Sequence, residues 1–215
     1  MIQLNANHFI YLLQAAQWTL LLSLIAFVGG SIVGLGLALL RVSKIGVLRV
    51  LASGYIQLVQ GTPLLIVLFL SYFGLGIMGF KLVPIVAAGL SLTLYAAAFL
   101  GEIWRGCIEA VPRTQWEASD CLGLTRFQQY AYVILPQSVR LAIPPTVGFM
   151  VQIVKNTSLA SVIGFVELAR AGQIVNNSTF EPFTIFTVVA AIYFAMCYPL
   201  SLAARALERK THAGR

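Results

Sequence analysis

Residues 18–40 read WTLLLSLIAFVGGSIVGLGLALL and contain no Asp, Glu, Lys or Arg. A helix needs about 20 apolar residues to cross about 30 Å of hydrocarbon, because each residue adds about 1.5 Å along the helix axis. This stretch is therefore long enough and apolar enough to span a membrane. Residues 7–14, which precede it, are also uncharged, and we expect them to form a short separate helix on the outer membrane surface.

Further uncharged runs cover residues 50–80, 82–101 and 182–204. They predict additional spans at residues 54–73, 82–101 and 183–204. Hydrophobic residues make up 59% of the chain and charged residues 10%, whereas soluble domains contain about 25% charged residues. Composition and uncharged runs together indicate an integral membrane protein.

One more span is expected within residues 143–165, where the helix is broken. Arg140 and Lys155 lie too close together for a complete span to fit between them. If Pro145 lies in the first turn of a helix, where its missing N–H is harmless, the helix can continue to about residue 165. The sequence therefore predicts an all-α protein with about five transmembrane helices, in a single domain over residues 1–215.

The basic residues predict the orientation of these spans, because five spans place the two termini on opposite sides. If the N-terminus lies outside, the three inner segments hold three, four and four of the 14 Lys and Arg residues. Cytoplasmic segments of membrane proteins are enriched in these residues. We therefore predict an outer N-terminus and an inner C-terminus. The net charge of +7 is attributed to this asymmetry and not to nucleic-acid binding.

Two glycines of the first span, Gly30 and Gly34, lie four residues apart. Small residues at this spacing let two helix backbones approach each other closely. Packing within the chain is the simpler interpretation, and the sequence leaves a contact with a second subunit open.

The segment at residues 102–140 differs from the rest of the chain. It contains four of the seven acidic residues and four arginines, between two apolar stretches. Residues 113–129 have the pattern of an amphipathic helix that is broken at Gly123. Long structured loops between spans usually bind something, so we interpret this segment as a cytoplasmic binding loop.

Within this loop the residues Glu117-Ala118-Ser119, Gly123 and Val133-Ile134-Leu135-Pro136 resemble, with full spacing, the EAA loop of ABC importer permeases. Ser119 stands where the pattern has Ala, and Val133 where it has Ile, and both are small changes in volume. Three further stretches resemble the polar amino acid branch of that family: QGTPLL at 60–65, EIWRG at 102–106 and KNTSL at 155–159. The resemblance covers nearly the whole chain.

The resemblance implies the type I importer fold and an ATP-driven importer of polar amino acids in the bacterial cytoplasmic membrane. The implied partners are two copies of a cytoplasmic ATP-binding subunit, a second permease subunit of the same or a related sequence, an extracytoplasmic substrate-binding protein, the amino acid and membrane lipid. No nucleic acid is expected. The chain lacks a Gly-x-x-x-x-Gly-Lys-[Ser/Thr] loop, so ATP and Mg are expected on the ATP-binding subunit, with no cofactor bound by this chain.

The resemblance further implies that the loop presents a short coupling helix to the ATPase. Its characteristic residues are Glu117, Ala118, Ser119, Gly123, Leu135 and Pro136. Gly123 would permit a sharp turn, and Glu117 is expected near a helix start, where the dipole favours a negative charge. Pro136 is expected to end the preceding hydrogen-bonded turn. The alternative is an ordinary amphipathic helix on the membrane surface.

Polar residues at membrane depth are candidates for the transport pathway, because burying them is costly unless their groups are satisfied. In the fourth span these are Gln152, Lys155, Asn156, Thr157 and Ser158. The alternative is that Lys155 extends to the membrane interface while the others cap a helix end. Gln57 and Gln60 of the second span are weaker candidates. The fourth span contains no acidic residue, which favours neutral or acidic amino acids as the solute.

Two other function classes are disfavoured. A membrane-embedded enzyme needs a nucleophile and base or a metal cluster, but His8 and His212 lie at the two ends of the chain and Asp120 is the only aspartate. A secondary transporter or channel without an ATPase partner typically has an intramembrane carboxylate or an internal repeat. The sequence shows neither feature.

Overall fold

The computed structural model describes residues 4–213, in which every regular element is a helix. In chain order the elements are α1 (Ala6–Arg41), α2 (Gly46–Gly61), α3 (Leu64–Phe69), the π-helix η1 (Leu70–Gly74), α4 (Leu75–Ile77), α5 (Pro84–Glu109), α6 (Arg113–Cys121), α7 (Arg126–Gln128), the π-helix η2 (Gln129–Ile134), α8 (Leu135–Asn156), the 3-10 helix η3 (Thr157–Ile163), α9 (Leu168–Thr179) and α10 (Pro182–Ala213).

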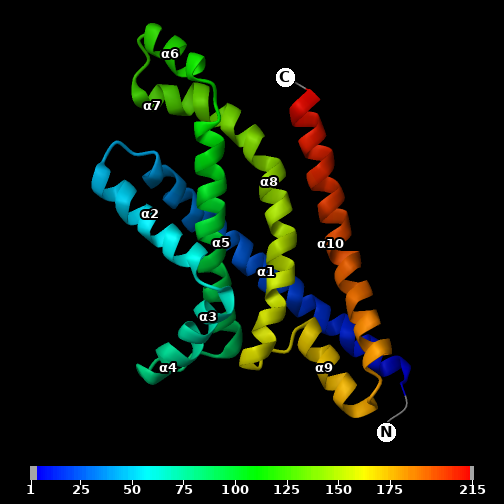
Figure 1. The fold of residues 1–215 in the computed structure, drawn as a ribbon. Coiled ribbons are helices and arrows are strands. Elements are labelled where there is room, and N and C mark those ends of the chain that lie inside the picture. The colour runs from blue at the N-terminus through cyan, green and yellow to red at the C-terminus, as the bar shows by residue number, and fades with distance from the viewer. Residues whose placement is uncertain (1–3, 214–215) are drawn as a thin grey trace.

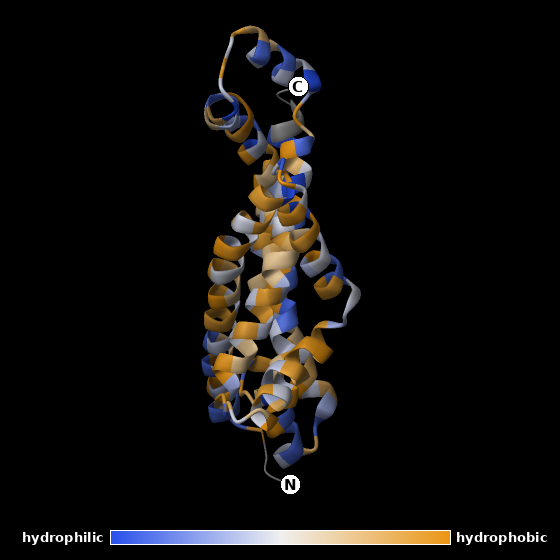
Figure 2. Cartoon of the chain, turned by 90° about the vertical axis from the view of Figure 1, so that its left-hand side faces the viewer, coloured by the Kyte–Doolittle hydropathy of each residue, from blue (hydrophilic) through white to orange (hydrophobic). Residues whose placement is uncertain are grey.

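Four helical stretches within the described residues are long and apolar enough to cross a membrane, and the bent pair formed by α2 and α3–α4 makes a fifth. This confirms the all-α fold with about five spans. The N-terminus lies at one end of the bundle, and α6, α7 and the C-terminus lie at the other (Figure 1). Hydrophilic residues gather around α6 and α7 at that second end, while hydrophobic residues cover the middle of the bundle (Figure 2).

Helix α1 begins earlier than predicted. The Asn5 side chain accepts hydrogen bonds from the backbone amides of Asn7 and His8 (3.1 and 3.3 Å), and the ring of His8 accepts one from the Asn5 amide (3.2 Å). From this cap the helix continues without a break to Arg41, so the separate surface helix expected at residues 7–14 is wrong. Its 36 residues give a length of about 54 Å, and α1 runs obliquely across the bundle (Figure 1).

Helices α1 and α5 touch along what we call the α1–α5 seam, formed by Gly30 and Gly34 on α1 and Ala96, Ala97 and Gly101 on α5. A Cβ atom added to Gly30 would lie 2.4 Å from the Cβ of Ala96, and one added to Gly34 would lie 3.1 Å from the carbonyl oxygen of Ala97. Only glycine permits this approach. The predicted close contact therefore lies within the chain.

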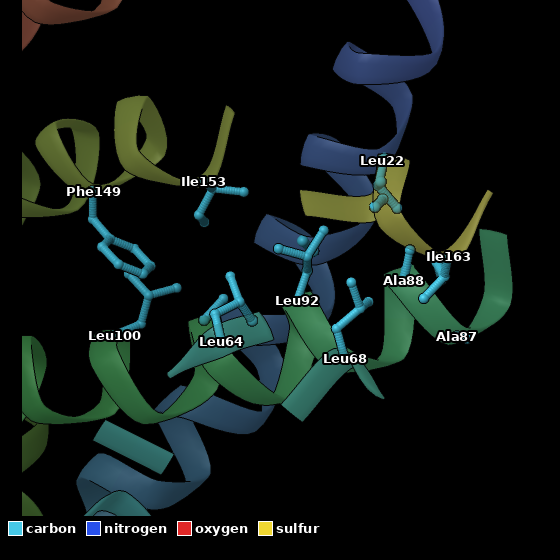
Figure 3. Close-up of a cluster of buried hydrophobic side chains, with 13 residues drawn as sticks. Leu22, Leu64, Leu68, Ala87, Ala88, Leu92, Leu100, Phe149, Ile153 and Ile163 are labelled. Atoms are coloured by element: carbon cyan, nitrogen blue, oxygen red, sulfur yellow. The ribbon is translucent and has the colours of Figure 1, made fainter. Parts of the chain in front are cut away.

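The main hydrophobic core lies beside this seam. Figure 3 shows Leu22 of α1, Leu64 and Leu68 of α3, Leu92 of α5 and Ile163 of η3 in one buried cluster. Each of these side chains is at most 8% exposed. The cluster joins helices from both halves of the chain and positions α8 and η3 against α5.

The second span, predicted at residues 54–73, is bent. Helix α2 ends at Gly61, α3 begins at Leu64, and the two parts meet at 103°. Pro63 has no N–H, and its ring disfavours a helical conformation for Thr62, which is extended (φ −109°, ψ 132°). The span predicted at residues 54–73 is therefore present as a bent pair of helices.

Two predictions about proline are wrong. Pro136 does not end a turn, because α7, η2 and α8 follow one another without a gap and Pro136 is the second residue of α8. Pro144 and Pro145 lie inside α8 and not at its start. The break comes later, at Thr157, where the α-helix tightens into η3 and continues to Ile163, close to the predicted end.

Candidate functional site

We call residues 113–128, which comprise α6, the turn at Gly123 and α7, the tip segment. Its inner side is packed against the ends of α5 and α8. The ring of Trp116 meets that of Tyr130 edge to face at 5.2 Å, and both pack on the buried cluster that contains Ile108 and Ile134. Ser119 is 2% exposed and donates a hydrogen bond to the Trp116 carbonyl (2.7 Å). A small side chain is required there, and serine meets this requirement with its hydroxyl satisfied.

The turn between α6 and α7 is fixed by its own polar contacts. Gly123 has φ +69°, a left-handed conformation that glycine adopts without steric cost. The buried amide of Gln129 donates to the carboxylate of Asp120 and to the carbonyl of Leu124. Thr125 caps α7 through reciprocal bonds with Gln128. The predicted sharp turn at Gly123 is therefore present, with a defined shape.

The outer side of the tip segment carries apolar side chains. Leu122 and Phe127 are each 77% exposed, beside the exposed Glu117 and Ala118. Large exposed apolar side chains on an otherwise polar segment mark an interaction surface. The sequence analysis missed Leu122 and Phe127, although their positions on either side of Gly123 in a polar loop were a usable signal.

Two predictions about this region need correction. Glu117 is the fifth residue of α6 and lies outside its first turn, so the helix dipole gives it little stabilisation. Leu135 packs in the cluster beneath the tip segment. Residues 102–109 continue α5, so the loop begins after Glu109 and not at residue 102.

The base of the tip segment is held by ion pairs between helix ends. Arg105 binds Glu102 and Glu109 on the same helix. Arg41, the last residue of α1, lies 3.6 Å from the Glu102 carboxylate. These contacts tie the ends of α1 and α5 together next to the tip segment.

The polar residues of α8 form a second candidate region. Gln152 donates to the side-chain oxygen of Asn156 (3.1 Å), and Asn156 interacts with the hydroxyl of Tyr95 on α5. Beside them the rings of Phe99 and Phe149 are stacked, with centroids 5.5 Å apart, and Tyr95 and Phe99 lie 4.4 Å apart. The structure thus brings Gln152 and Asn156 to an aromatic column between α5 and α8.

The other residues predicted for this region lie elsewhere. Thr157 is fully buried and donates to the Val154 carbonyl (2.7 Å), which disagrees with its expected contact with a solute. Ser158 donates to the Lys155 carbonyl (2.7 Å), as in the alternative interpretation of a helix end, and Lys155 is exposed near Cys197 of α10. Gln57 and Gln60 are exposed on α2, and none of the hydrogen bonds described for residues 4–213 joins them to α8.

Neither nearby carboxylate is available to this polar region. Glu102 is paired with Arg105 and Arg41. Glu167 is fully buried and accepts hydrogen bonds from the amides of Ala169 and Arg170 (2.9 and 2.8 Å) and from the Tyr193 hydroxyl (2.8 Å). Burial raises the pKa of Glu167 above its ordinary value, although the hydrogen bonds act in the opposite direction. Within the described part of the chain, no three His, Cys, Asp or Glu side chains are placed to hold a metal ion.

Comparison with known proteins shows what this arrangement is similar to. Residues 26–213 match the family described as "Binding-protein-dependent transport system inner membrane component". The chain is 35% identical to the probable amino-acid ABC transporter permease protein YckA of Bacillus subtilis, over 97% of this chain and 92% of that protein. It is 36% identical to the L-cystine transport system permease protein TcyB of the same organism, over 90% and 83%.

Solved structures agree with these relatives. A subunit in the crystal structure of an amino acid ABC transporter with histidines superposes with a TM-score of 0.91 and 31% identity, over 97% of this chain and 100% of that chain. A subunit of the MetNI methionine ABC transporter shares the fold, with a TM-score of 0.83 at 20% identity and coverage of 97% and 99%. The chain therefore belongs to the family of binding-protein-dependent transport system inner membrane components.

Proposed function

We propose that this chain is the transmembrane permease subunit of an ABC importer that carries polar amino acids across a bacterial cytoplasmic membrane. Family membership decides against the alternative of a secondary transporter or channel. The amino acid class is supported by relatives named for amino acids and for L-cystine. An extracytoplasmic binding protein would deliver the solute to the end of the bundle opposite the tip segment.

The observation that carries the proposal is the two-sided tip segment. Its inner side is packed on the bundle through Trp116 and Ser119, and its outer side exposes Leu122 and Phe127. A segment that is rigid on one side and apolar on the other can transmit a displacement from a partner to the spans. We assign this surface to a cytoplasmic ATP-binding subunit, two copies of which would bind ATP and Mg and hydrolyse ATP. The second permease would be a copy of this chain or a related one, and no cofactor is assigned to this chain.

The polar region on α8 supports a solute without net positive charge. Gln152 and Asn156 offer amide donors and acceptors next to Tyr95, and these can bind the polar groups of a zwitterion. The two nearby carboxylates are already occupied by arginines or by backbone amides, and Lys155 adds a positive charge. We therefore propose neutral or acidic amino acids, with Asn156 and Gln152 as the residues of the pathway.

The test compares two glycines with positive φ at opposite ends of the bundle. Gly123 (φ +69°) and Gly79 (φ +97°) both have open space around an added Cβ atom. In the reconstituted complex, Gly123→Asp should abolish the stimulation of ATP hydrolysis by solute-loaded binding protein, because the charge disturbs the contact with the ATP-binding subunit. Glu117→Ala should reduce stimulation only slightly, since an exposed ion pair contributes about 0.2–1 kcal/mol.

Gly79→Asp serves as the matched control, because it introduces the same side chain at an equally open left-handed glycine away from the tip segment. Because Gly79 lies at the end where the binding protein would dock, docking of solute-loaded binding protein is measured for both variants. At equal docking, the Gly79→Asp complex should retain full stimulation. Assembly of every complex is checked by size-exclusion chromatography. Full stimulation of an assembled Gly123→Asp complex would contradict the role of the tip segment.

A further inference from the structure

Two cavities lie one after the other between α1 and the continuous helix formed by α7, η2 and α8. The inner cavity, of about 390 Å³, is lined mainly by apolar side chains such as Leu35 of α1, Ile108 of α5, and Val139 and Ala142 of α8. It lies within the spans.

The outer cavity, of about 380 Å³, lies at the end of the bundle that carries the tip segment. It is lined by Leu39, Val42 and Ser43 at the end of α1, by Tyr130, and by the basic residues Lys44 and Arg126. Its described lining contains two cations and no carboxylate.

The two cavities are neighbours along α1 and have no lining residue in common. Leu35 of the inner cavity and Leu39 of the outer one are one helical turn apart on the same face of α1. Tyr130 of the outer cavity packs in the same hydrophobic cluster as Ile108 and Leu135, which line the inner one. We call the two neighbouring cavities together the groove, which is basic at the membrane surface and apolar towards the membrane interior.

The two cations are not used by the chain's own carboxylates. The salt bridges between residues 4 and 213 involve only Arg41 and Arg105 as cations. Lys44 is exposed, and Arg126 donates one hydrogen bond to the Gln129 side chain (3.2 Å). Both charges are available to an anion in the outer cavity.

We infer that this groove binds one anionic phospholipid, with its phosphate between Lys44 and Arg126 and one acyl chain in the inner cavity. Basic pockets between helices at the cytoplasmic surface bind anionic lipid head groups. The charge of the outer cavity and the apolar lining of the inner cavity fit the two ends of such a lipid. A free phosphate would leave the apolar part empty, and a partner protein as the occupant is left to the test.

The experiment measures lipid retention by native mass spectrometry of the intact transporter complex. The complex is purified after incorporation into vesicles of equal parts phosphatidylglycerol and phosphatidylcholine. We expect retention of phosphatidylglycerol over phosphatidylcholine. Lys44→Gln and Arg126→Gln should each weaken phosphatidylglycerol binding about five-fold, and the double variant about 25-fold, from the usual contribution of one cation near an anionic membrane.

Arg140→Gln is the matched control, because Arg140 is an exposed arginine of α8 that lines neither cavity. It should retain the lipid as the unmodified complex does. Ala142→Phe fills the inner cavity and should reduce retention of both lipids. Unchanged phosphatidylglycerol retention in the double variant would overturn the inference, and so would competition by inorganic phosphate as strong as that by the lipid.

A photoreactive phenylalanine derivative in place of Ser43 distinguishes lipid from protein as the occupant. Ser43 lines the outer cavity, so the probe should form an adduct with phosphatidylglycerol in the intact complex. An adduct with a protein subunit instead would contradict the lipid site.

Discussion

The α1–α5 seam and the outer side of the tip segment use side chains in opposite ways. At the seam, Gly30 and Gly34 have no side chain, and two helices of one chain can therefore touch. On the tip segment, the large apolar side chains of Leu122 and Phe127 are mostly exposed and are not buried by their own chain. The difference separates residues that build the bundle from residues kept for a partner. Substitutions at the seam should therefore lower stability, and substitutions on the tip segment should lower the affinity for a partner.

The largest effect is expected at the seam. Gly30→Leu places a branched side chain where even a Cβ atom lies 2.4 Å from Ala96, and overpacking of this kind costs about 3 kcal/mol or more. The purified protein should unfold at a clearly lower temperature in detergent. Gly36→Leu is the control, because nothing lies within 4 Å of a Cβ added there. Equal melting temperatures for the two variants would show that the seam is not tightly packed.

The tip segment should respond to a substitution that leaves the fold intact. Phe127→Ala removes a ring that is 77% exposed, so stability should be unchanged while affinity for the ATP-binding subunit falls. Burying a phenylalanine contributes about 1.5–3 kcal/mol, which corresponds to a loss of roughly ten- to a hundred-fold. Isothermal titration or surface plasmon resonance with the ATP-binding subunit measures it.

Phe183 gives the control for this variant. It is 86% exposed at the start of α10, at the opposite end of the bundle from the tip segment. Phe183→Ala should leave the affinity as it is. If both variants bind equally well, the exposed side chains of the tip segment do not form the contact.

A smaller effect is expected from a third comparison, between a buried and an exposed carboxylate. Glu167 is buried and satisfied by its own chain, whereas Glu117 is exposed on the tip segment. Because burial raises the pKa of Glu167 above its ordinary 4.5, the folded protein holds this proton more tightly than the unfolded one. Its contribution to stability is fully present below pH 4.5 and is lost as the pH rises through the folded value.

The measurement for Glu167 is the melting temperature as a function of pH. Glu167→Gln removes the titrating group. It should therefore remove the part of the decline in melting temperature that begins above pH 4.5. A profile for Glu167→Gln that is identical to that of the unmodified protein would mean that Glu167 does not titrate with folding.

Uncharged runs predicted where the spans lie, because a charge is costly to bury in a membrane at any position. The absence of charges can be read from the local sequence alone. Whether a span is straight or bent depends on its backbone conformation, which hydropathy does not describe. The bend at Thr62-Pro63 was readable from the proline, but Pro144 and Pro145 are accommodated inside α8. The helix formed by α7, η2 and α8 continues through Pro136 because of the π-helical turn of η2. No residue pattern in the sequence predicts that turn.

The candidate site was predicted in part for a similar reason. The turn at Gly123 follows from glycine's conformational freedom, so the sequence indicated it. Which side of α6 faces the bundle depends on the packing of Trp116 against Tyr130, and these residues come from different elements. The burial of Thr157, next in sequence to the accessible Asn156, likewise depends on the change from α-helix to η3.

The native thiol of Cys121 tests the central claim most directly. Cys121 is exposed at the end of α6, next to Leu122, while Cys107 is half-buried and Cys197 is buried. With Cys107→Ser and Cys197→Ser in place, the rate of maleimide labelling reports on the outer side of the tip segment alone. We predict rapid labelling of the isolated permease and at least a ten-fold slower reaction once the ATP-binding subunit is bound. Equal rates in the two states would contradict the assignment of the tip segment as the contact with the ATP-binding subunit.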